Sequence, residues 1–189
     1  NIINEDTIFV CSGSKMLRTT DGGTSWDTLL SNSTFYQSDF FDFNNGYAVS
    51  PMGYIIKTSN AGTVWDTIQG VPSNNSFFDV HMISDTTAIV SSDNGLIYKV
   101  TPTGFSVDTL YDLMAGGSPL TIKDFDFETP VIGFAGGVTA GLSGLARTVD
   151  GGNNWEVRAT NGFLDLNFDE VACIDSLNVW GIENSPSPL

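Results

Sequence analysis

Acidic side chains are the residues of this sequence best suited to chemistry, because Asp and Glu together number 22 among 189 residues. A retaining or inverting glycosidase needs two carboxylates that flank a sugar. No spacing among the acids singles out such a pair, and the alternative interpretation is that they are solvated strand ends. The acids that lie on or beside predicted strands are Asp39, Asp42, Asp79, Asp124, Asp126, Glu128, Asp169 and Glu170.

Other catalytic and binding signatures are weak. His81 is the only histidine, it has no Cys or second His nearby in sequence, and its alternation with Val80 and Met82 predicts an outward strand residue rather than a zinc ligand. A nucleophile-elbow Gly-x-Ser-x-Gly motif is absent. The Gly-rich segment Gly136–Gly144 lacks the Gly-Lys-Ser/Thr ending of a P-loop, so we interpret it as an extended loop that could set specificity. We therefore expect no catalytic, cofactor-binding or metal-binding residues.

The charge balance limits the partners. Acidic residues outnumber the 7 basic ones and give a net charge of −15, which argues against nucleic acid and against anionic membrane surfaces. The acidity favours solubility or the binding of cations or basic partners. No apolar run is long enough to span a membrane, and no secretory leader pattern is present. Cys11 and Cys173 are too few for a disulfide scaffold, and buried free thiols are expected, with a single disulfide as the alternative.

Four internal repeats organise the chain. Their Trp position falls at Trp26, Trp65, Val107 and Trp155, with spacings of 39, 42 and 48 residues. Short runs rich in β-branched and aromatic residues, punctuated by Gly and Asn, predict strands throughout and no helix. A period of this length built only of strands is typical of a β-propeller with one four-stranded blade per repeat. The aligned segments are Leu17–Leu29, Ile56–Ile68, Tyr98–Leu110 and Ala146–Arg158.

Three of the four repeats carry the pattern Thr-x-Asp/Asn-x-Gly-x-x-Trp. The acid or amide is expected to accept hydrogen bonds from backbone N–H groups a residue or two onward, Gly supplies a positive φ, and Trp covers the turn. In the third repeat Pro102 and Val107 replace the acid and the Trp, so we expect a reshaped turn there. The three intact copies are Thr19, Asp21, Gly23 and Trp26; Thr58, Asn60, Gly62 and Trp65; and Thr148, Asp150, Gly152 and Trp155.

A second pattern accompanies the first. A basic residue precedes the motif and an acidic residue follows the Trp position in every repeat, always nine residues apart. In a symmetric hairpin the two positions face each other, so we predict a cross-strand ion pair in every blade, contributing about 0.2–1 kcal/mol if exposed. The pairs are Arg18 with Asp27, Lys57 with Asp66, Lys99 with Asp108, and Arg147 with Glu156.

The motif resembles the Asp-box, or BNR, repeat of sialidase-like and related propellers. Sialidases hold a carboxylate with three arginines and use a Tyr/Glu nucleophile pair, whereas this chain has only Arg18, Arg147 and Arg158, two of which occupy the repeated ion-pair position. The resemblance therefore implies the fold and a structural role for the motif. Xyloglucan-type hydrolases use related propellers, with catalytic acids between two domains, so a hydrolase fragment is an alternative.

A further resemblance narrows the family. Asn45–Val49, Gly53–Thr58 and Gly133–Gly137 are similar to photosystem II stability/assembly-factor-like propellers, and such repeats are abundant in secreted and cell-surface proteins of Bacteroidetes-type bacteria. The resemblance implies a non-catalytic binding or scaffold module, secreted, at the cell surface or in the periplasm, whose partner is a protein or a glycan. A structural subunit of an extracellular assembly is a second alternative.

The predicted architecture is all-β, with about four blades and part of a fifth, as a segment of a larger ring. Thr7–Ser12 aligns with the second strand of the unit, so the innermost strand of the first blade is expected to be missing. Phe168–Ile174 aligns with an innermost strand and Asn178–Ile182 with a second strand, which leaves blade edges open to self-association. The expected repeats are 7–30, 35–69, 77–110, 122–158 and 166–183, with 184–189 as a linker or the start of another strand.

Overall fold

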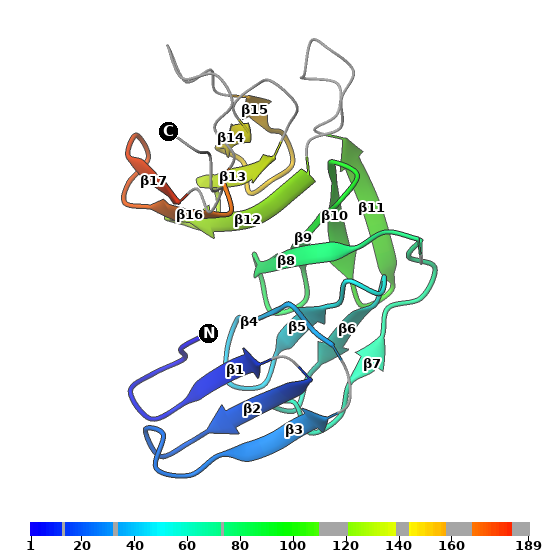
Figure 1. Ribbon diagram of the computed structural model, residues 1–189, viewed down its shortest axis with the longest axis vertical. Helices are drawn as coiled ribbons and strands as arrows, with labels where there is room; N and C mark the ends of the chain where they lie inside the picture. Colours follow the sequence, from blue (N-terminus) through cyan, green and yellow to red (C-terminus); the bar gives the residue numbers. More distant parts are fainter. Residues whose placement is uncertain are drawn as a thin grey trace, which may run out of the picture. The chain divides into compact units, whose positions relative to one another are not determined.

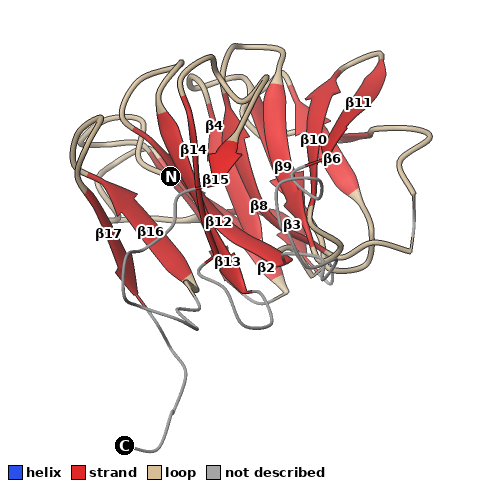
Figure 2. Ribbon diagram, turned by 90° about the horizontal axis from the view of Figure 1, so that it is seen from above, coloured by secondary structure: helices blue, strands red, loops and turns tan. Residues whose placement is uncertain are grey.

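The computed structural model describes residues 1–12, 14–31, 34–72, 74–109, 121–138, 144–157 and 168–182. These residues form antiparallel strands joined by turns, and no helix occurs among them (Figure 2). The all-β prediction is confirmed for this part of the chain. No described helix is long and apolar enough to cross a membrane.

The strands form five sheets, which we number as blades 1 to 5 in chain order (Figure 1). Blade 1 contains β1 (Ile8–Ser12), β2 (Lys15–Thr19) and β3 (Asp27–Ser31). Blade 2 contains β4 (Gln37–Phe40), β5 (Gly46–Val49), β6 (Ile55–Thr58) and β7 (Asp66–Thr67). Blade 3 contains β8 (Phe77–Met82), β9 (Ala88–Ser92), β10 (Leu96–Thr101) and β11 (Gly104–Thr109). Blade 4 contains β12 (Thr121–Phe127), β13 (Gly133–Val138), β14 (Gly144–Thr148) and β15 (Glu156–Val157), and blade 5 contains β16 (Glu170–Cys173) and β17 (Val179–Ile182).

The chain forms two compact units. The first comprises Asn1–Val90 and Lys99–Ser106, and the second comprises Ser91–Tyr98 and Val107–Leu189. Blades 1 and 2 therefore belong to the first unit and blades 4 and 5 to the second, while the strands of blade 3 contribute to both. Each unit is described by itself below.

Apolar side chains pack between neighbouring blades within each unit. In the first unit, the ring of Phe9 in blade 1 stacks on that of Phe40 in blade 2, with centroids 3.6 Å apart. Met16 packs against Ala48 and Ile56 of blade 2. Because side chains alternate across a strand, each blade can bury apolar residues on both faces. In the second unit, Phe134 and Leu145 of blade 4 pack in the same way against Val171 of blade 5.

The start of the chain forms a short pairing with blade 1. Ile2 forms an isolated antiparallel bridge with Ile8 of β1, and the amide of Phe9 donates to the carbonyl of Asn1 at 2.9 Å. The amino group of Asn1 in turn donates to the carbonyl of Phe9 at 2.9 Å. Blade 1 therefore remains a three-stranded sheet of β1, β2 and β3, as the alignment predicts, and Asn1–Ile3 adds only an isolated bridge along the edge of β1.

A side-chain cap closes the turn between the first two strands of every blade. Asp42 Oδ1 accepts hydrogen bonds from the amides of Asn44 and Asn45 at 2.7 and 2.8 Å. Asp175 Oδ1 accepts from the amides of Leu177 and Asn178 at 2.8 and 2.9 Å. Short Asp, Asn, Ser and Thr side chains favour such turns because their oxygens reach amides two and three residues onward. The same pair of bonds is formed by Asn4, Ser84 and Thr129.

The third repeat has a different outer hairpin, as the loss of its motif predicts. Strand β10 ends at Thr101 and β11 begins at Gly104, so only Pro102 and Thr103 connect them. In blade 1 the equivalent connection runs from Thr19 to Asp27. Gly104 has a φ of 149°, which a residue with a side chain rarely adopts.

Gly46 is required by the packing of blade 2 rather than by its backbone angles. A Cβ atom added to Gly46 would lie 2.5 Å from the ring of Phe40, and that ring cannot withdraw because it is stacked on Phe9. Gly133 is related in the same way to Phe127, where the distance is again 2.5 Å.

We predict that Gly46→Ala lowers the free energy of unfolding by about 1–3 kcal/mol through overpacking. Without the clash, Ala in a strand would stabilise by about 0.5–1 kcal/mol relative to Gly, so the sign of the change is decisive. Denaturant unfolding of the variant and the wild type measures it, and a variant more stable than wild type would contradict the packing described for Phe40.

Candidate functional site

The three intact motif turns share one hydrogen-bond arrangement. In blade 1, Thr19 Oγ1 donates to Asp21 Oδ1 at 2.8 Å and accepts from the amide of Gly23 at 2.9 Å. Asp21 Oδ1 also accepts from the amide of Ser25 at 2.8 Å. The Thr hydroxyl is buried, whereas the acid lies at the surface. The second and third turns repeat these bonds with Thr58, Asn60, Gly62 and Val64, and with Thr148, Asp150, Gly152 and Asn154.

This arrangement revises the expected role of the turn acid. Its side-chain oxygen accepts from the amide four residues onward, not from the next one or two. The residue that bonds the nearer amides is the Thr, whose hydroxyl accepts from the amides two and four residues onward. The motif residues thus hold the backbone of the turn, because turn amides need acceptors when no strand partner is available.

The Trp residues differ in their surroundings. Trp26 is 43% exposed, and its Nε1 donates to the carbonyl of Gly23 at 3.1 Å. Trp65 packs edge-on against Phe40 with ring centroids 6.0 Å apart. Trp155 packs edge-on against Phe127, also at 6.0 Å. In blade 2, Trp65 therefore packs against Phe40, whose ring lies beside Gly46. In blade 4, Trp155 packs against Phe127, whose ring lies beside Gly133.

The register of the outer hairpins is the one expected from the basic and acidic pattern. Arg18 is opposite Asp27, Lys57 opposite Asp66, and Arg147 opposite Glu156. In blade 1 the two side chains form an ion pair of 2.7 Å, and Arg18 Nη1 also donates to the carbonyl of Ala61 in blade 2 at 3.0 Å.

The expectation of an ion pair in every blade does not hold. Within the described part of the chain, Lys57 and Asp66 face each other without an ion pair between them. The guanidinium of Arg147 lies 6.0 Å from the ring centroid of Phe134. The side chain of Asp108, the expected partner of Lys99, lies outside the described residues, as does Arg158.

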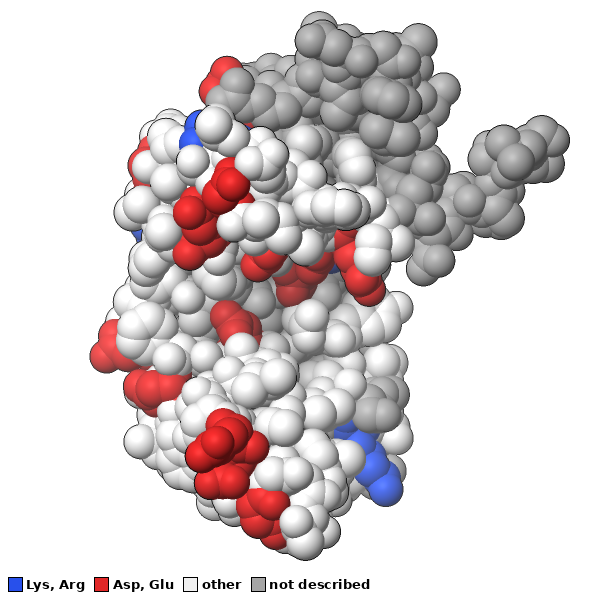
Figure 3. Space-filling model, turned by 90° about the vertical axis from the view of Figure 1, so that its left-hand side faces the viewer, with Lys and Arg blue, Asp and Glu red and all other residues white. Residues whose placement is uncertain are grey.

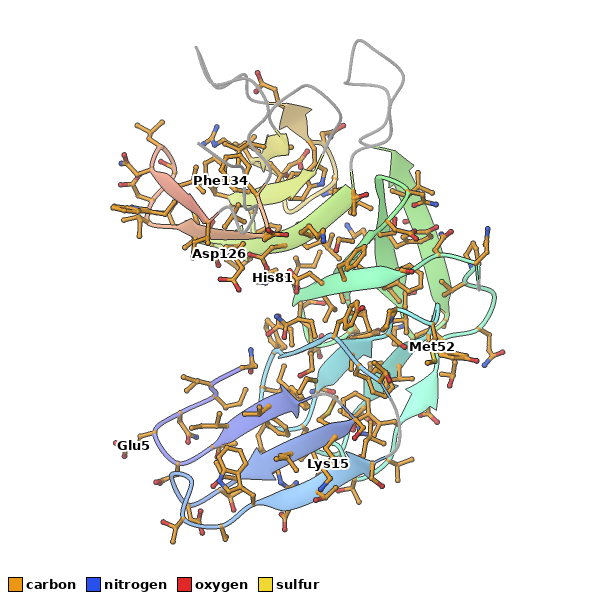
Figure 4. All side chains as sticks on the ribbon, in the orientation of Figure 1. Glu5, Lys15, Met52, His81, Asp126 and Phe134 are labelled. Carbon is orange, nitrogen blue, oxygen red and sulfur yellow. The ribbon has the colours of Figure 1, made fainter. Side chains whose placement is uncertain are left out.

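Acids of the innermost strands connect neighbouring blades. Asp39 Oδ2 of β4 accepts from the amide of Met82 in β8 at 2.8 Å. Asp124 Oδ2 of β12 accepts from the amide of Val171 in β16 at 2.8 Å. Asp126 Oδ2, also of β12, accepts from the amide of Cys173 at 2.6 Å (Figure 4). The interpretation of these three acids as solvated strand ends is therefore wrong, because each carboxylate is bonded to the backbone of the next blade.

The remaining candidate acids serve other local contacts or face solvent. Asp42 caps its turn, as described above, and Asp169 lies 3.8 Å from the amino group of Lys123. Asp79 is buried, with 4% of its surface exposed. Glu128 and Glu170 are exposed.

Asp39 has the most unusual surroundings among these carboxyl groups. It accepts bonds from the amides of Phe40 and Met82 and from the side chain of Asn1, and its Oδ2 lies 3.6 Å from Nδ1 of His81 (Figure 4). Burial raises the pKa of Asp39, while His81 and the backbone amides oppose that rise. His81 is more exposed than its strand neighbours Val80 and Met82, as the alternation predicted, although its side chain is only 27% exposed and lies beside Asp39.

The thiols and the hollow beside Trp155 add little chemistry. Cys11 and Cys173 are free and half-buried, and burial raises the pKa of both thiols. Among the described residues no group of three or more His, Cys, Asp or Glu is placed to hold a metal ion. A hollow of about 160 Å³ beside Trp155 is lined by Arg147, Asp150 and Glu156, which is smaller than the roughly 300–1,000 Å³ of ligand pockets.

Acidic side chains outnumber basic ones at the surface. On the face drawn in Figure 3, Asp and Glu form several separate groups and Lys and Arg are few.

The loop expected at Gly136–Gly144 begins and ends within strands, since Gly136 and Gly137 belong to β13 and Gly144 to β14. Residues 139–143 lie outside the described part of the chain.

Solved structures resemble this chain, although no family model and no curated protein matches its sequence. YCF48 from Cyanidioschyzon merolae aligns with a TM-score of 0.64 and 14% identity over 90% of this chain and 61% of its own. The GH74 xyloglucanase from Xanthomonas campestris aligns with a TM-score of 0.63 and 15% identity over 87% of this chain and 31% of its own. The WD40 β-propeller domain of Doa1 aligns with a TM-score of 0.67 and 14% identity over 93% of this chain and 57% of its own. The chain thus spans less than two thirds of each, and its fold is that of a β-propeller.

We predict that the buried Thr hydroxyl contributes more to each turn than its methyl group. Thr58→Val keeps the shape but leaves the buried amide of Gly62 without an acceptor, which costs about 1–3 kcal/mol of unfolding free energy. Thr58→Ser keeps the acceptor and should cost clearly less. Chemical denaturation of both variants compares them, and equal losses would show that the hydroxyl does not hold the turn.

We also predict that stability depends on pH through the turn acids. The side chain and amide of Ser25, together with Thr19, lower the pKa of Asp21 to about 2. A carboxyl whose folded pKa is lowered stabilises the fold above its unfolded pKa of about 3.9 and loses this effect as the pH falls toward 2.

Asp21→Asn is the matched variant, because Asn60 occupies the equivalent position in blade 2 and forms the same bonds. Unfolding free energies measured between pH 5 and pH 2 should converge for wild type and Asp21→Asn as the pH falls. Asn60→Asp should acquire the dependence that Asp21→Asn loses. Curves for wild type and Asp21→Asn that stay parallel across this range would refute the assignment.

Proposed function

We propose that this chain is a non-catalytic binding or scaffold module of the Asp-box propeller type, in which the repeat supplies rigidity and the blade surfaces supply recognition. The observation that carries the proposal is that acids of the innermost strands accept hydrogen bonds from the neighbouring blade. Asp39, Asp124 and Asp126 are bonded to backbone amides of the next blade, and a carboxylate so engaged is poorly placed to attack a sugar or to activate water.

The motif residues support the same proposal. The oxygens of Asp21, Asn60 and Asp150 accept amide bonds of their own turns, and the equivalence of acid and amide at this position indicates that no charge is needed there. An Asn at this position can form the same turn bonds but cannot act as a general acid or a nucleophile. The Asp-box assignment therefore concerns how the hairpins are held.

The similar structures support both a non-catalytic role and a hydrolytic one. GH74 enzymes are among them, and this chain covers 31% of the Xanthomonas campestris xyloglucanase, so a fragment of a carbohydrate-active hydrolase is the second candidate. A structural subunit of an extracellular assembly is the third. The non-catalytic binding role is preferred because Asp39, Asp124 and Asp126 of the innermost strands already accept bonds from the backbone of the next blade.

We propose in addition that the module acts outside the cytoplasm, secreted, at the cell surface or in the periplasm, with a protein or glycan partner and without nucleic acid, membrane insertion or a cofactor. The net charge of −15 disfavours polyanionic partners. Fractionation of the native cells with an antibody against the chain tests the location, and recovery in the cytoplasmic fraction alone would refute it.

A glycan array followed by a turnover assay separates the first two candidate functions. We expect incubation with xyloglucan to release no reducing ends, whether or not the array shows binding. Asp39→Asn and Asp126→Asn are the matched variants, since an amide oxygen can still accept the bonds from Met82 and Cys173. Hydrolysis by the wild type that is lost in either variant, with the fold retained by circular dichroism, would replace the binding role with the hydrolytic one.

A further inference from the structure

Three exposed apolar side chains lie at one end of blade 2, opposite the end that carries its turn cap and its motif turn. Tyr36, Met52 and Tyr54 are 52%, 63% and 53% exposed. Tyr36 directly precedes β4, and Met52 and Tyr54 belong to the turn between β5 and β6 (Figure 4). Exposed apolar residues that gather at one place mark a surface that binds a partner.

A fourth side chain joins these three from the neighbouring blade. The ring of Phe78 in β8 stacks on that of Tyr36, with centroids 5.8 Å apart and ring planes inclined by 16°. All four residues lie in the first unit of the chain. We call Tyr36, Met52, Tyr54 and Phe78 together the Tyr36 surface.

Buried Ser50 connects the segments that carry this surface. Its Oγ donates to the carbonyl of Thr34 at 2.7 Å and accepts from the amide of Met52 at 3.1 Å. Its backbone carbonyl accepts from the amide of Phe77 at 3.3 Å, and its amide donates to the carbonyl of Tyr54 at 2.9 Å. The fold therefore holds the surface in place before any ligand binds, which lowers the cost of ordering it on binding.

The segments that form the Tyr36 surface contain no charged residue. Residues 32–38, 50–54 and 68–78 include no Asp, Glu, Lys, Arg or His, although the chain has 22 acidic and 7 basic residues. Their hydrogen-bonding side chains are amides and hydroxyls, and the amides of Gln37 and Asn74 are exposed, as are Tyr36 and Tyr54. Because such a surface offers no charge to complement an ionic partner, it fits a neutral ligand.

A neutral glycan has the chemistry that these groups recognise. The C–H groups on the face of a sugar ring carry partial positive charge and pack on the negative face of an aromatic ring, while sugar hydroxyls donate to and accept from side-chain amides. Tyr supplies a large rigid contact at low cost in conformational entropy. A protein interface would surround its apolar centre with a polar rim, where charged pairs set the register, and these segments have no charge to contribute.

We propose that the Tyr36 surface binds a neutral oligosaccharide, which stacks on Tyr36 and Tyr54 and bonds to the amides of Gln37 and Asn74. The inference rests on the proposed binding role and deepens it, because it names a ligand class and the place where that ligand binds.

Isothermal titration calorimetry of the 189-residue chain tests this assignment. The probes are four neutral hexasaccharides, namely cellohexaose, mannohexaose, xylohexaose and laminarihexaose, together with the acidic hexagalacturonate. We expect at least one neutral probe to bind with an affinity that added salt leaves unchanged, because no charge is screened. Hexagalacturonate should not bind, since the chain itself carries a net charge of −15.

Matched variants locate the contact. Tyr36→Ala and Tyr54→Ala should each weaken binding by about tenfold through loss of stacking, whereas Tyr36→Phe keeps the ring and should retain most of the affinity. Phe41→Ala is the control, because Phe41 is also 52% exposed and flanks the same strand, β4, at its other end. It should leave the affinity unchanged, and circular dichroism checks that each variant is folded.

The outcomes separate this assignment from the binding role. The assignment is overturned if no neutral hexasaccharide binds, or if Tyr36→Ala and Tyr54→Ala bind as tightly as wild type, and the binding role then still stands. A protein partner lost in Tyr36→Ala, without glycan binding, would overturn the ligand class. Release of reducing ends from a bound probe would instead overturn the non-catalytic role, and the loss of affinity in the variants would still support the site.

Discussion

The structure depends on side-chain oxygens that satisfy backbone amides where strands cannot. A propeller blade is a short sheet, so much of its backbone lies in turns and at strand ends, and buried amides without an acceptor cost free energy. The turn caps, from Asn4 in blade 1 to Asp175 in blade 5, meet this need at the inner turns. The Thr hydroxyls of the outer turns and the acids of the innermost strands meet it elsewhere.

Aromatic packing builds on these hydrogen bonds. Once the turns are fixed, Phe40 lies over Gly46 and against Phe9 and Trp65, and Phe127 occupies the same position beside Gly133 and Trp155. The absence of a side chain on Gly allows the ring to approach the neighbouring strand. One arrangement of Gly, Phe and Trp therefore forms the core of two different blades, although blade 2 carries Asn60 where blade 4 carries Asp150.

Much of this fold could be predicted from the sequence, because the motif turns recur in register and their residues act locally. The strands, the outer hairpin register and the altered hairpin at Pro102 follow from local residue types. The bonds of Asp39 and Asp126 could not be predicted, since they join positions that are 43 and 47 residues apart in sequence. Ion pairs were over-predicted, because a shared register places Lys57 opposite Asp66 without requiring their long side chains to meet.

The functional interpretation follows from the same constraint. Asp39, Asp124 and Asp126 of the innermost strands, which were candidates for catalysis by residue type alone, are bonded to the backbone of the next blade in the structure. The acids of the innermost strands hold neighbouring blades together, and under the proposed binding role the blade surfaces are left for recognition.

Amide hydrogen exchange, followed residue by residue by NMR, tests this account most directly. The amides of Met82, Val171 and Cys173 donate to a carboxylate of another blade. The account predicts that they exchange as slowly as amides paired inside the four-stranded sheets. Exchange at the rate of exposed loop amides would contradict it, because the innermost-strand acids would then not be holding the blades together.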